Sequence, residues 1–574
     1  MLKMSTDLWH NGGISRFRYC RTSKTLRKAA TKRTSGKFCF FIMLLASWSL
    51  PARSMAAVPA EEDSIGENTT TISANMPLTD SVYQELQTLA DAGLLGNFFS
   101  SNKPLAISQV AGLISQAQTK LSDRTSHNEW WREYLGRLDK RYRKSTVWRN
   151  RIGPLRFRSW DIGYFWLRQP VRLIPQTNAQ LVPFLSNREG RSFDPGYNLF
   201  VEGAFDFRFS SFALLSAQVR WQQSDRTHNA GQVTLRNLYF KMRLKGIEMQ
   251  AGRDNLAWGP GFSGSMGLNN NTEPFDFVNL SNLNPYRLPW LLKHLGPIKS
   301  TVFLARLDKD RSDFPNPGLF GLSLNTTPTP WLEIGLHRWM LFGGKGSSDA
   351  GFKYLITDFF FRLGTDKNRS SINNASELDV RFRLPYAEGM HLYANVYWED
   401  SNLMDNFPFL PHKLGRDTAS MFGMSIPNLL EKGRLGIQAE HVRTTRITYR
   451  HSRYYSGFTF KRRLLGHDLG PSGQGGYIRL KSTIKPSLAL IFSTAIERRG
   501  DEVTNPPMLN RLRADPDHAT GEWRYRFIPG FCWDLTSGRR LTGQIGYERV
   551  KYFGFSKNAH QHNAFFELGI KMGL

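Results

Sequence analysis

The feature that most constrains the fold is a two-residue repeat that returns in many short segments after residue 155. In residues 199–209 the odd positions are apolar or glycine, whereas Glu202, Asp206 and Arg208 occupy even positions. The same alternation recurs in residues 213–221, 238–244, 378–383, 390–398 and 541–548. Successive side chains of a β-strand point to opposite faces, so each segment predicts a strand with one polar and one apolar face. The chain is therefore predicted to be mainly β.

The charged face of each strand requires water, and the apolar face requires a second sheet or lipid. Aromatic residues make up 13% of the chain, yet its mean hydropathy is only −0.41. No apolar stretch after residue 50 reaches the length of about 20 residues that a membrane helix needs. A soluble all-β protein could share this composition, but a sandwich of this size would be unusual. The pattern favours a transmembrane antiparallel β-barrel.

The N-terminal segment supports export. Residues 1–37 carry ten Lys or Arg residues, residues 38–50 are apolar, and small residues follow at 54–57. This order is typical of a secretory signal, so residues 1–57 are predicted to be a signal peptide. A membrane anchor is the alternative, which the short apolar segment disfavours. Eleven of the 76 basic residues lie in the first 53 positions, and the remainder form no single patch, so a nucleic-acid partner is not expected.

The chain is predicted to have a helical domain at residues 58–150 and a barrel at residues 151–574. Apolar residues recur at helical spacing between residues 79 and 143, where Ser81 with Gln84 and Ser126 with Glu129 fit capping boxes. The barrel segment, at about 10 residues a strand plus connections, predicts about 18 strands. Alternating apolar residues at 566–574 predict the strand that closes the barrel.

A first group of candidate site residues precedes the turn at residues 259–261. Arg253, Asp254, Asn255 and Trp258 combine an aromatic face, an amide and charges, which are the groups that bind polysaccharide. The planar guanidinium of an arginine can engage the carboxylate of an acidic sugar through two hydrogen bonds. The alternative is that these residues fill the barrel lumen as part of a plug.

His451, Tyr454, His467 and Asp468 form a second candidate group, with the same two interpretations. No catalytic role is expected, since the chain lacks a Gly-x-Ser-x-Gly elbow, a His-Glu-x-x-His motif and a phosphate-binding loop. Cys532 is the one cysteine outside the predicted signal peptide, which excludes a cysteine-based metal site. Neither a metal nor a cofactor is expected.

Several motifs resemble the Wzi family of capsule-assembly proteins. These motifs lie at residues 89–95, 251–261, 332–338, 397–400 and 449–468. Arg338, in the third of them, is counted with the candidate binding residues. The resemblance implies an outer-membrane barrel of about 18 strands with a helical bundle in the periplasm.

The resemblance also implies a lectin-like role without catalysis, in which capsular or another surface polysaccharide is attached to the cell. Expected partners are that polysaccharide, outer-membrane lipid and, in a further interpretation, the capsule-export machinery. The alternative function is an outer-membrane porin or polysaccharide-export channel. A water-filled path through the lumen would distinguish such a channel from a plugged tether.

Overall fold

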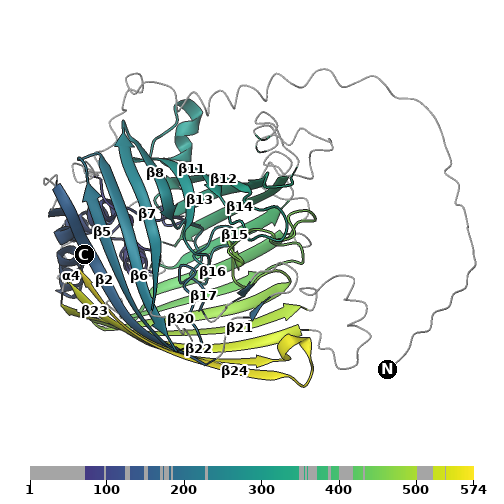
Figure 1. Ribbon diagram of the computed structural model, residues 1–574. Coiled ribbons are helices and arrows are strands. Elements are labelled where there is room, and N and C mark those ends of the chain that lie inside the picture. Colours follow the sequence, from purple (N-terminus) through teal and green to yellow (C-terminus); the bar gives the residue numbers. More distant parts are fainter. Residues whose placement is uncertain are drawn as a thin grey trace, which may run out of the picture. The chain divides into compact units, whose positions relative to one another are not determined.

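The structure is a computed structural model (Figure 1). It describes residues 72–95, 99–122, 129–147, 153–168, 172–173, 180–181, 185–225, 231–347, 355, 359, 372–384, 389–399, 418–430, 434–500, 521–536 and 538–573. The predicted signal peptide lies outside these residues.

Eighteen antiparallel strands form a closed barrel, which confirms the predicted fold class and strand number. The strands are β2 (Gly153–Leu167), β5 (Gly196–Arg208), β6 (Ala213–Ser224), β7 (Gln232–Leu244), β8 (Ile247–Asp254), β10 (Phe275–Asn282), β11 (Ile298–Arg306), β12 (Gly318–Thr329), β13 (Leu332–Phe342), β14 (Ile372–Arg383), β15 (His391–Glu399), β16 (Thr418–Leu430), β17 (Leu435–Arg443), β20 (Gly473–Lys485), β21 (Leu488–Gly500), β22 (Gly521–Thr536), β23 (Arg539–Lys551) and β24 (His560–Gly573). The barrel closes between β24 and β2, where Gly573 lies opposite Ser159 and Phe565 opposite Leu167.

The barrel is apolar on its outside and charged on its inside. Large apolar side chains remain exposed on the outer wall, for example Phe422 at 55% and Ile545 at 59%. Charged side chains point inward and are almost completely buried, among them Glu202, Arg220 and Glu497. This distribution is the reverse of that in a water-soluble protein and suits a wall that faces lipid. None of the helices in the described part of the chain is long and apolar enough to cross a bilayer.

Among the described residues, three helices precede the barrel: α2 (Val82–Asp91), α3 (Ile107–Ser122) and α4 (Glu129–Val147). Their apolar faces share one core, which also includes Leu214 at the start of β6. We call the described residues between 72 and 147 the helical cap. The cap lies at the barrel end where short turns connect the strands, and the Ile72 N–H donates to the Ser211 carbonyl in one of these turns. In Figure 1, α4 lies close to the C-terminal end of the chain.

The first helix is capped differently from the prediction. Ser81 takes the N-cap position, but its side chain makes no capping hydrogen bond to the backbone; its hydroxyl donates to Glu85 instead. Asp80 accepts the Val82 N–H through Oδ1 at 3.0 Å. The predicted capping box at Ser81 is therefore wrong, because the preceding carboxylate satisfies the free N–H of the first turn. Ser126 of the second predicted box lies outside the described residues.

Ion pairs attach the cap to the last strands of the barrel. Asp534 on β22 accepts hydrogen bonds from Arg137 and Arg141 of α4 and from Arg540 of β23. Arg540 also donates to Glu85 of α2 at 2.8 Å. These side chains are largely buried, so removal of Asp534 would leave Arg137 without its acidic partner and Arg141 and Arg540 with Glu85 alone.

The ion pair between Asp80 and Lys571 of β24 should make attachment of the cap depend on pH. Burial acts to raise the pKa of Asp80, but the Lys571 ammonium and the Val82 N–H outweigh it and hold this pKa below its usual value. A lowered carboxylate pKa contributes stability that is present above the unfolded-state pKa of about 3.9 and is lost as pH falls through the folded-state pKa.

We therefore expect hydrogen exchange of α2 to accelerate as the pH is lowered below about 4, after correction for the intrinsic exchange rate. An Asp80→Asn variant should exchange faster than the wild type at neutral pH and respond less to acid. Identical pH profiles for the two proteins would show that this ion pair does not hold the cap.

Two long loops fold back into the lumen from the opposite end. We call residues 255–274 and 444–472 the plug. Their apolar side chains pack against inward residues of the wall in one buried cluster, at whose centre Trp258 is completely buried. The short strand β1 (Asn102–Lys103) of the cap pairs with β9 (Ala257–Trp258), and the Gly259 N–H donates to the Ser101 carbonyl at 2.8 Å. The cap and the plug therefore meet inside the barrel.

The remaining short elements lie in the connections. They are β3 (Arg172–Leu173), β4 (Gln180–Leu181), β18 (Thr459–Phe460), β19 (Arg463–Leu464) and the 3₁₀ helices η3 (Trp290–Leu295) and η7 (Phe553–Phe555).

Candidate functional site

Three residues of the first candidate group lie inside the barrel. Asp254 accepts hydrogen bonds from the side chains of Asn75, Gln250 and Asn237 at 2.8, 2.9 and 2.6 Å. Asn255 and Trp258 are buried beside the cap and in the plug core. These interactions join the cap, the wall and the plug, so these side chains serve packing and lumen hydrogen bonding.

Arg253 lies on the other face of the wall. It is the penultimate residue of β8 and stands directly opposite Asp276 of β10, with which it forms two hydrogen bonds of 2.9 and 3.0 Å. Both side chains are well exposed, at 39% and 62%. Asp254 points into the lumen, so its neighbour must point outward. Arg253 is therefore separated from the other residues of its motif.

Arg338 also faces outward. His337, the preceding residue of β13, points into the lumen, and Arg338 donates to the Ser376 hydroxyl at 2.8 Å on the outer side. Its guanidinium lies 5.2 Å from the centre of the Phe359 ring, which belongs to an apolar cluster on the outer wall. Arg338 is thus buried away from the lumen.

The second candidate group divides between two depths. His467 is fully buried: its Nε2 lies 3.1 Å from the Ser263 hydroxyl, and its Nδ1 accepts the Leu469 N–H. Asp468 beside it is buried near Arg499 and Arg526 of the wall, and burial raises its pKa. These two residues connect the plug to β21 and β22.

His451 and Tyr454 lie nearer the mouth, where they hold the shape of the 444–472 loop. His451 Nδ1 accepts the N–H groups of Arg453 and Tyr454 at 3.3 and 3.2 Å. The Tyr454 hydroxyl donates to the Gly343 carbonyl at 2.9 Å, and burial raises the pKa of this tyrosine to about 12. The phenol is therefore neutral at physiological pH and remains a hydrogen-bond donor.

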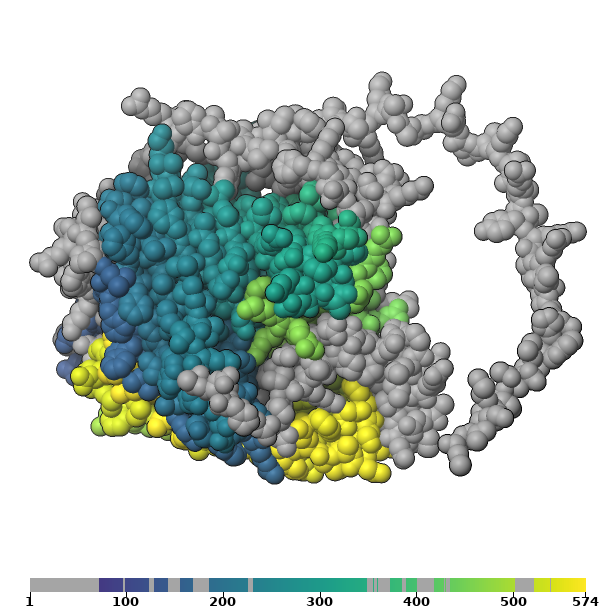
Figure 2. Space-filling model, viewed as in Figure 1, coloured from purple at the N-terminus to yellow at the C-terminus, as the bar shows by residue number. Residues whose placement is uncertain are grey.

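The same loop carries an exposed basic surface. We call Arg446, Arg453, Tyr455, Lys461 and Arg462 the mouth surface; all five side chains are exposed, Tyr455 at 49%. The loop connects the end of β17 to the start of β20, at the barrel end opposite the helical cap. Light-green atoms from this part of the chain are visible at the surface beside the teal barrel wall in Figure 2.

A buried ion pair supports the mouth surface from below. Arg311 forms two hydrogen bonds with Asp313 and donates to the carbonyls of Gly457 and Thr459. The Tyr455 hydroxyl donates to the Ser312 carbonyl, which ties the two loops together. Because these contacts order the loop, its exposed side chains are presented from a supported backbone.

The mouth surface is basic. Lys461 pairs with Glu273 at 2.7 Å, and the adjoining 307–317 loop exposes one base, Lys309, and one acid, Asp310. The mouth surface itself contains three arginines and one lysine and no acid. Arginines can bind carboxylates through two hydrogen bonds, and an exposed tyrosine ring beside them can stack on a sugar ring.

The second candidate group predicted from the sequence contains His451 and Tyr454 but not the cations around them. The sequence signal for these cations is the local density of basic residues between 443 and 463, which exceeds that of the neighbouring segments.

Within the described part of the chain, His337, Glu377 and Asp379 are the one group of three side chains that could hold a metal ion.

The sequence model for the capsule assembly protein Wzi matches residues 170–565. The chain belongs to the Wzi family. The match covers most of the barrel, including both plug loops and the mouth surface. No curated protein matches the sequence.

The fold agrees with this family. The solved structure of Wzi from Escherichia coli, described as an outer-membrane protein involved in group 1 capsule assembly and a carbohydrate-binding β-barrel, matches with a TM-score of 0.62. The match has 16% identity and covers 88% of this chain and 100% of that chain. OccD3 (OpdP) of Pseudomonas aeruginosa matches with 9% identity and a TM-score of 0.43 over 74% of this chain and 92% of that one.

Proposed function

We propose that this member of the Wzi family is an outer-membrane protein that attaches an acidic surface polysaccharide to the cell through its mouth surface. Membership of the capsule-assembly family supports a role with surface polymer. The observation that carries the proposal is the exposed cluster of arginines and a tyrosine at one barrel end. Such a surface suits a chain of carboxylated sugars and requires no chemical step.

The proposed orientation places the helical cap in the periplasm and the mouth surface outside the cell. In bacterial outer-membrane barrels the short turns are periplasmic and the longer loops extracellular. The cap lies at the end with short turns, such as those at residues 209–212 and 245–246. Residues 1–57 would direct export and then be removed.

The filled lumen supports a tether over a solute channel. The plug packs Trp258, Tyr449 and other large side chains against the inner wall. A porin needs a continuous aqueous path, which this packing opposes.

The test is the distribution of polysaccharide in a strain that lacks the protein, measured separately for cells and medium. We expect the total amount of polymer to be unchanged and a larger share to be released into the medium. If the polymer stays on the cells while solute uptake falls, the protein is a channel and the proposal is wrong.

Arg253 provides a second prediction. Because its side chain forms an exposed ion pair on the outer wall, an Arg253→Ala variant should lose no more than about 1 kcal/mol of stability. Binding of the purified protein to the polysaccharide should be unchanged within about twofold, since the mouth surface is intact. A tenfold loss of affinity, measured by biolayer interferometry, would place Arg253 in the binding site.

A further inference from the structure

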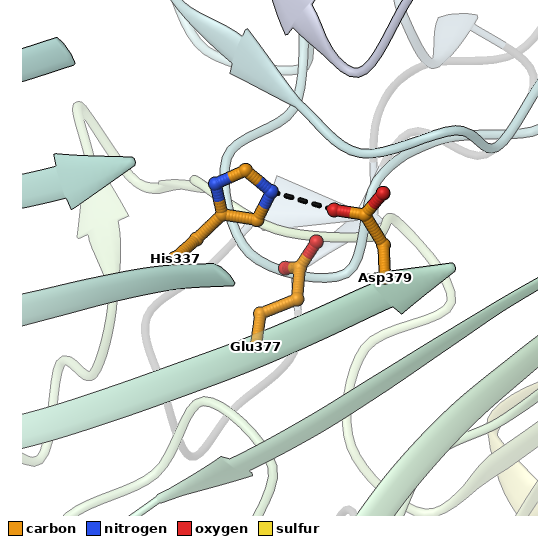
Figure 3. Close-up of side chains that lie close together, drawn as sticks. All are labelled: His337, Glu377 and Asp379. Carbon is orange, nitrogen blue, oxygen red and sulfur yellow. Dashed lines mark hydrogen bonds and ion pairs between the residues drawn. The ribbon is translucent and has the colours of Figure 1, made fainter. Parts of the chain in front are cut away.

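His337, Glu377 and Asp379 form a buried cluster on the inner wall, separate from the mouth surface (Figure 3). His337 of β13 pairs in register with Glu377 of β14, and Gly335 pairs with Asp379. Gly335 makes the room: a Cβ there would lie 2.1 Å from Asp379 Oδ2. All three side chains are completely buried, so they are surrounded by protein and not by bulk water.

The potential ligand atoms of the three side chains converge. One nitrogen of His337 and one carboxylate oxygen each of Glu377 and Asp379 lie within 4.8 Å of one another. His337 Nε2 lies 2.6 Å from Asp379 Oδ2, and Figure 3 shows the Glu377 carboxylate directed toward this pair. Ligands of a tetrahedral zinc ion, bound at about 2.0–2.2 Å, are separated by roughly 3.5 Å. To bind an ion, His337 and Asp379 would have to move apart by roughly 1 Å, and the Glu377 carboxylate would have to approach them by a side-chain rotation.

The cluster contains more negative charge than its neighbours balance. Two carboxylates share a single imidazole, so the three groups carry at least one net negative charge when both acids are ionised. The contacts of Asp379 are His337 and the Ser101 hydroxyl at 2.9 Å. A divalent cation with a neutral histidine would bring the cluster to zero charge, which removes the large cost of burying an unbalanced carboxylate.

An unsatisfied oxygen provides a second, independent observation. Glu377 Oε1 accepts a hydrogen bond from Asn395 Nδ2 at 2.6 Å, whereas Glu377 Oε2 is buried and has only the nearby Gly267 N–H, which makes no hydrogen bond of standard geometry to it. Asn395 Oδ1 is likewise buried and unpartnered. Exchange of the oxygen and nitrogen positions of this amide, which an amide flip allows, would direct Oδ1 toward Glu377. Asn395 could then supply a fourth ligand.

The donor set selects among cations. Calcium takes six to eight oxygen ligands, and magnesium usually keeps several waters, whereas this buried cluster offers one nitrogen with two or three oxygens. One imidazole with carboxylates in a four-coordinate arrangement suits zinc.

We propose that His337, Glu377, Asp379 and Asn395 form a structural site for a divalent transition-metal ion of the zinc type. The ion would connect the wall to the plug and the cap. Gly267 of the plug lies so close that a Cβ there would be 2.5 Å from Glu377 Oε2, and Ser101 of the cap bonds to Asp379. A metal bound here therefore fixes three parts of the fold at one point.

The test uses the full-length protein, purified in detergent after removal of any affinity tag and refolded with zinc, then passed through a desalting column. Mass spectrometry of the metals should find about one zinc per chain. Cobalt in its place should give the visible absorption of a four-coordinate nitrogen–oxygen site. Glu377→Gln and Asp379→Asn should each lower the bound zinc at least tenfold.

The matched control is Glu333→Gln, which alters another buried lumen carboxylate, one that accepts hydrogen bonds from Ser100 and Ser101. It should retain one zinc per chain. Less than a tenth of an equivalent in the wild type, or equal zinc in all variants, would overturn the proposal.

If a cluster variant fails to fold, measurements on the wild-type protein alone can test the proposal. Its thermal unfolding temperature should rise with zinc during refolding and fall when a chelator replaces the metal. No difference between the two preparations would overturn the proposal and indicate a cluster neutralised by a proton on Glu377.

Discussion

An Arg446→Glu, Arg453→Glu double variant is expected to bind the acidic polysaccharide about ten- to a hundredfold more weakly than the wild type. Both side chains are exposed on the mouth surface, so the change replaces two attractions to a polyanion by two repulsions without disturbing the core. Exposed charges are screened by salt, and the affinity of the wild type should therefore fall as ionic strength rises. The variant should show a weaker salt dependence. Biolayer interferometry with immobilised polymer measures both effects.

Arg539→Glu is the matched control for this variant. Arg539 is also exposed, but it lies at the start of β23 beside the helical cap, at the other end of the barrel. Its reversal should leave the affinity within about twofold of the wild type. If Arg539→Glu and the mouth variant reduce binding equally, the polymer responds to overall charge and not to the mouth surface.

A Trp258→Ala variant should have the largest effect on the interior. The indole is completely buried and packs against the rings of Phe303, His337 and Trp339, with centroids 5.4, 5.5 and 5.9 Å away. Loss of a buried tryptophan costs about 3–5 kcal/mol, because a cavity replaces these contacts. The hydrogen bonds between the barrel strands do not involve this side chain. The substitution should therefore destabilise the plug and leave the barrel wall intact.

The 255–274 loop of the Trp258→Ala variant should therefore exchange its amide hydrogens roughly a hundredfold faster or more. In planar bilayers, where the wild type should show no steady conductance, the variant should show intermittent openings. Trp290→Ala is the control, since that side chain is 80% exposed on η3. A Trp258→Ala protein whose plug exchanges as slowly as that of the wild type would show that this residue does not hold the plug.

The architecture of the barrel could be predicted because its signal is local. Alternation of apolar and charged residues sets the two faces of a strand, and β5 at Gly196–Arg208 agrees closely with the predicted segment 199–209. The last strand pairs with the first, as the alternation near residue 570 predicts. Family membership, carried by short motifs, is confirmed by the match over residues 170–565.

The grouping of site residues was harder to predict, because a motif places residues near one another in sequence and not on one face. Successive side chains of a strand point to opposite faces, so Arg253 and Asp254 lie on different faces of the wall, as do His337 and Arg338. Applied to those pairs, this rule would have assigned one member of each to the outer wall. The capping error at Ser81 had a similar cause, since two adjacent residues could both cap the helix.

The cluster of His337, Glu377 and Asp379 depends on pairing across strands and on loops folded in from distant parts of the chain. Its members on β13 and β14 are about 40 positions apart, and Ser101 and Gly267 come from the cap and the plug. Sequence spacing carries no information about the register between strands. The cluster could therefore not be recognised from the sequence, and no metal site was expected.

The most direct test of the account is retention of polysaccharide by cells that lack the native protein and express the Arg446→Glu, Arg453→Glu variant at the wild-type level in the outer membrane. The wild type and the Arg539→Glu control should restore cell-bound polymer, whereas the mouth variant should release most of it into the medium without a change in the total. If the mouth variant retains the polymer as well as the wild type, the mouth surface is not where attachment occurs.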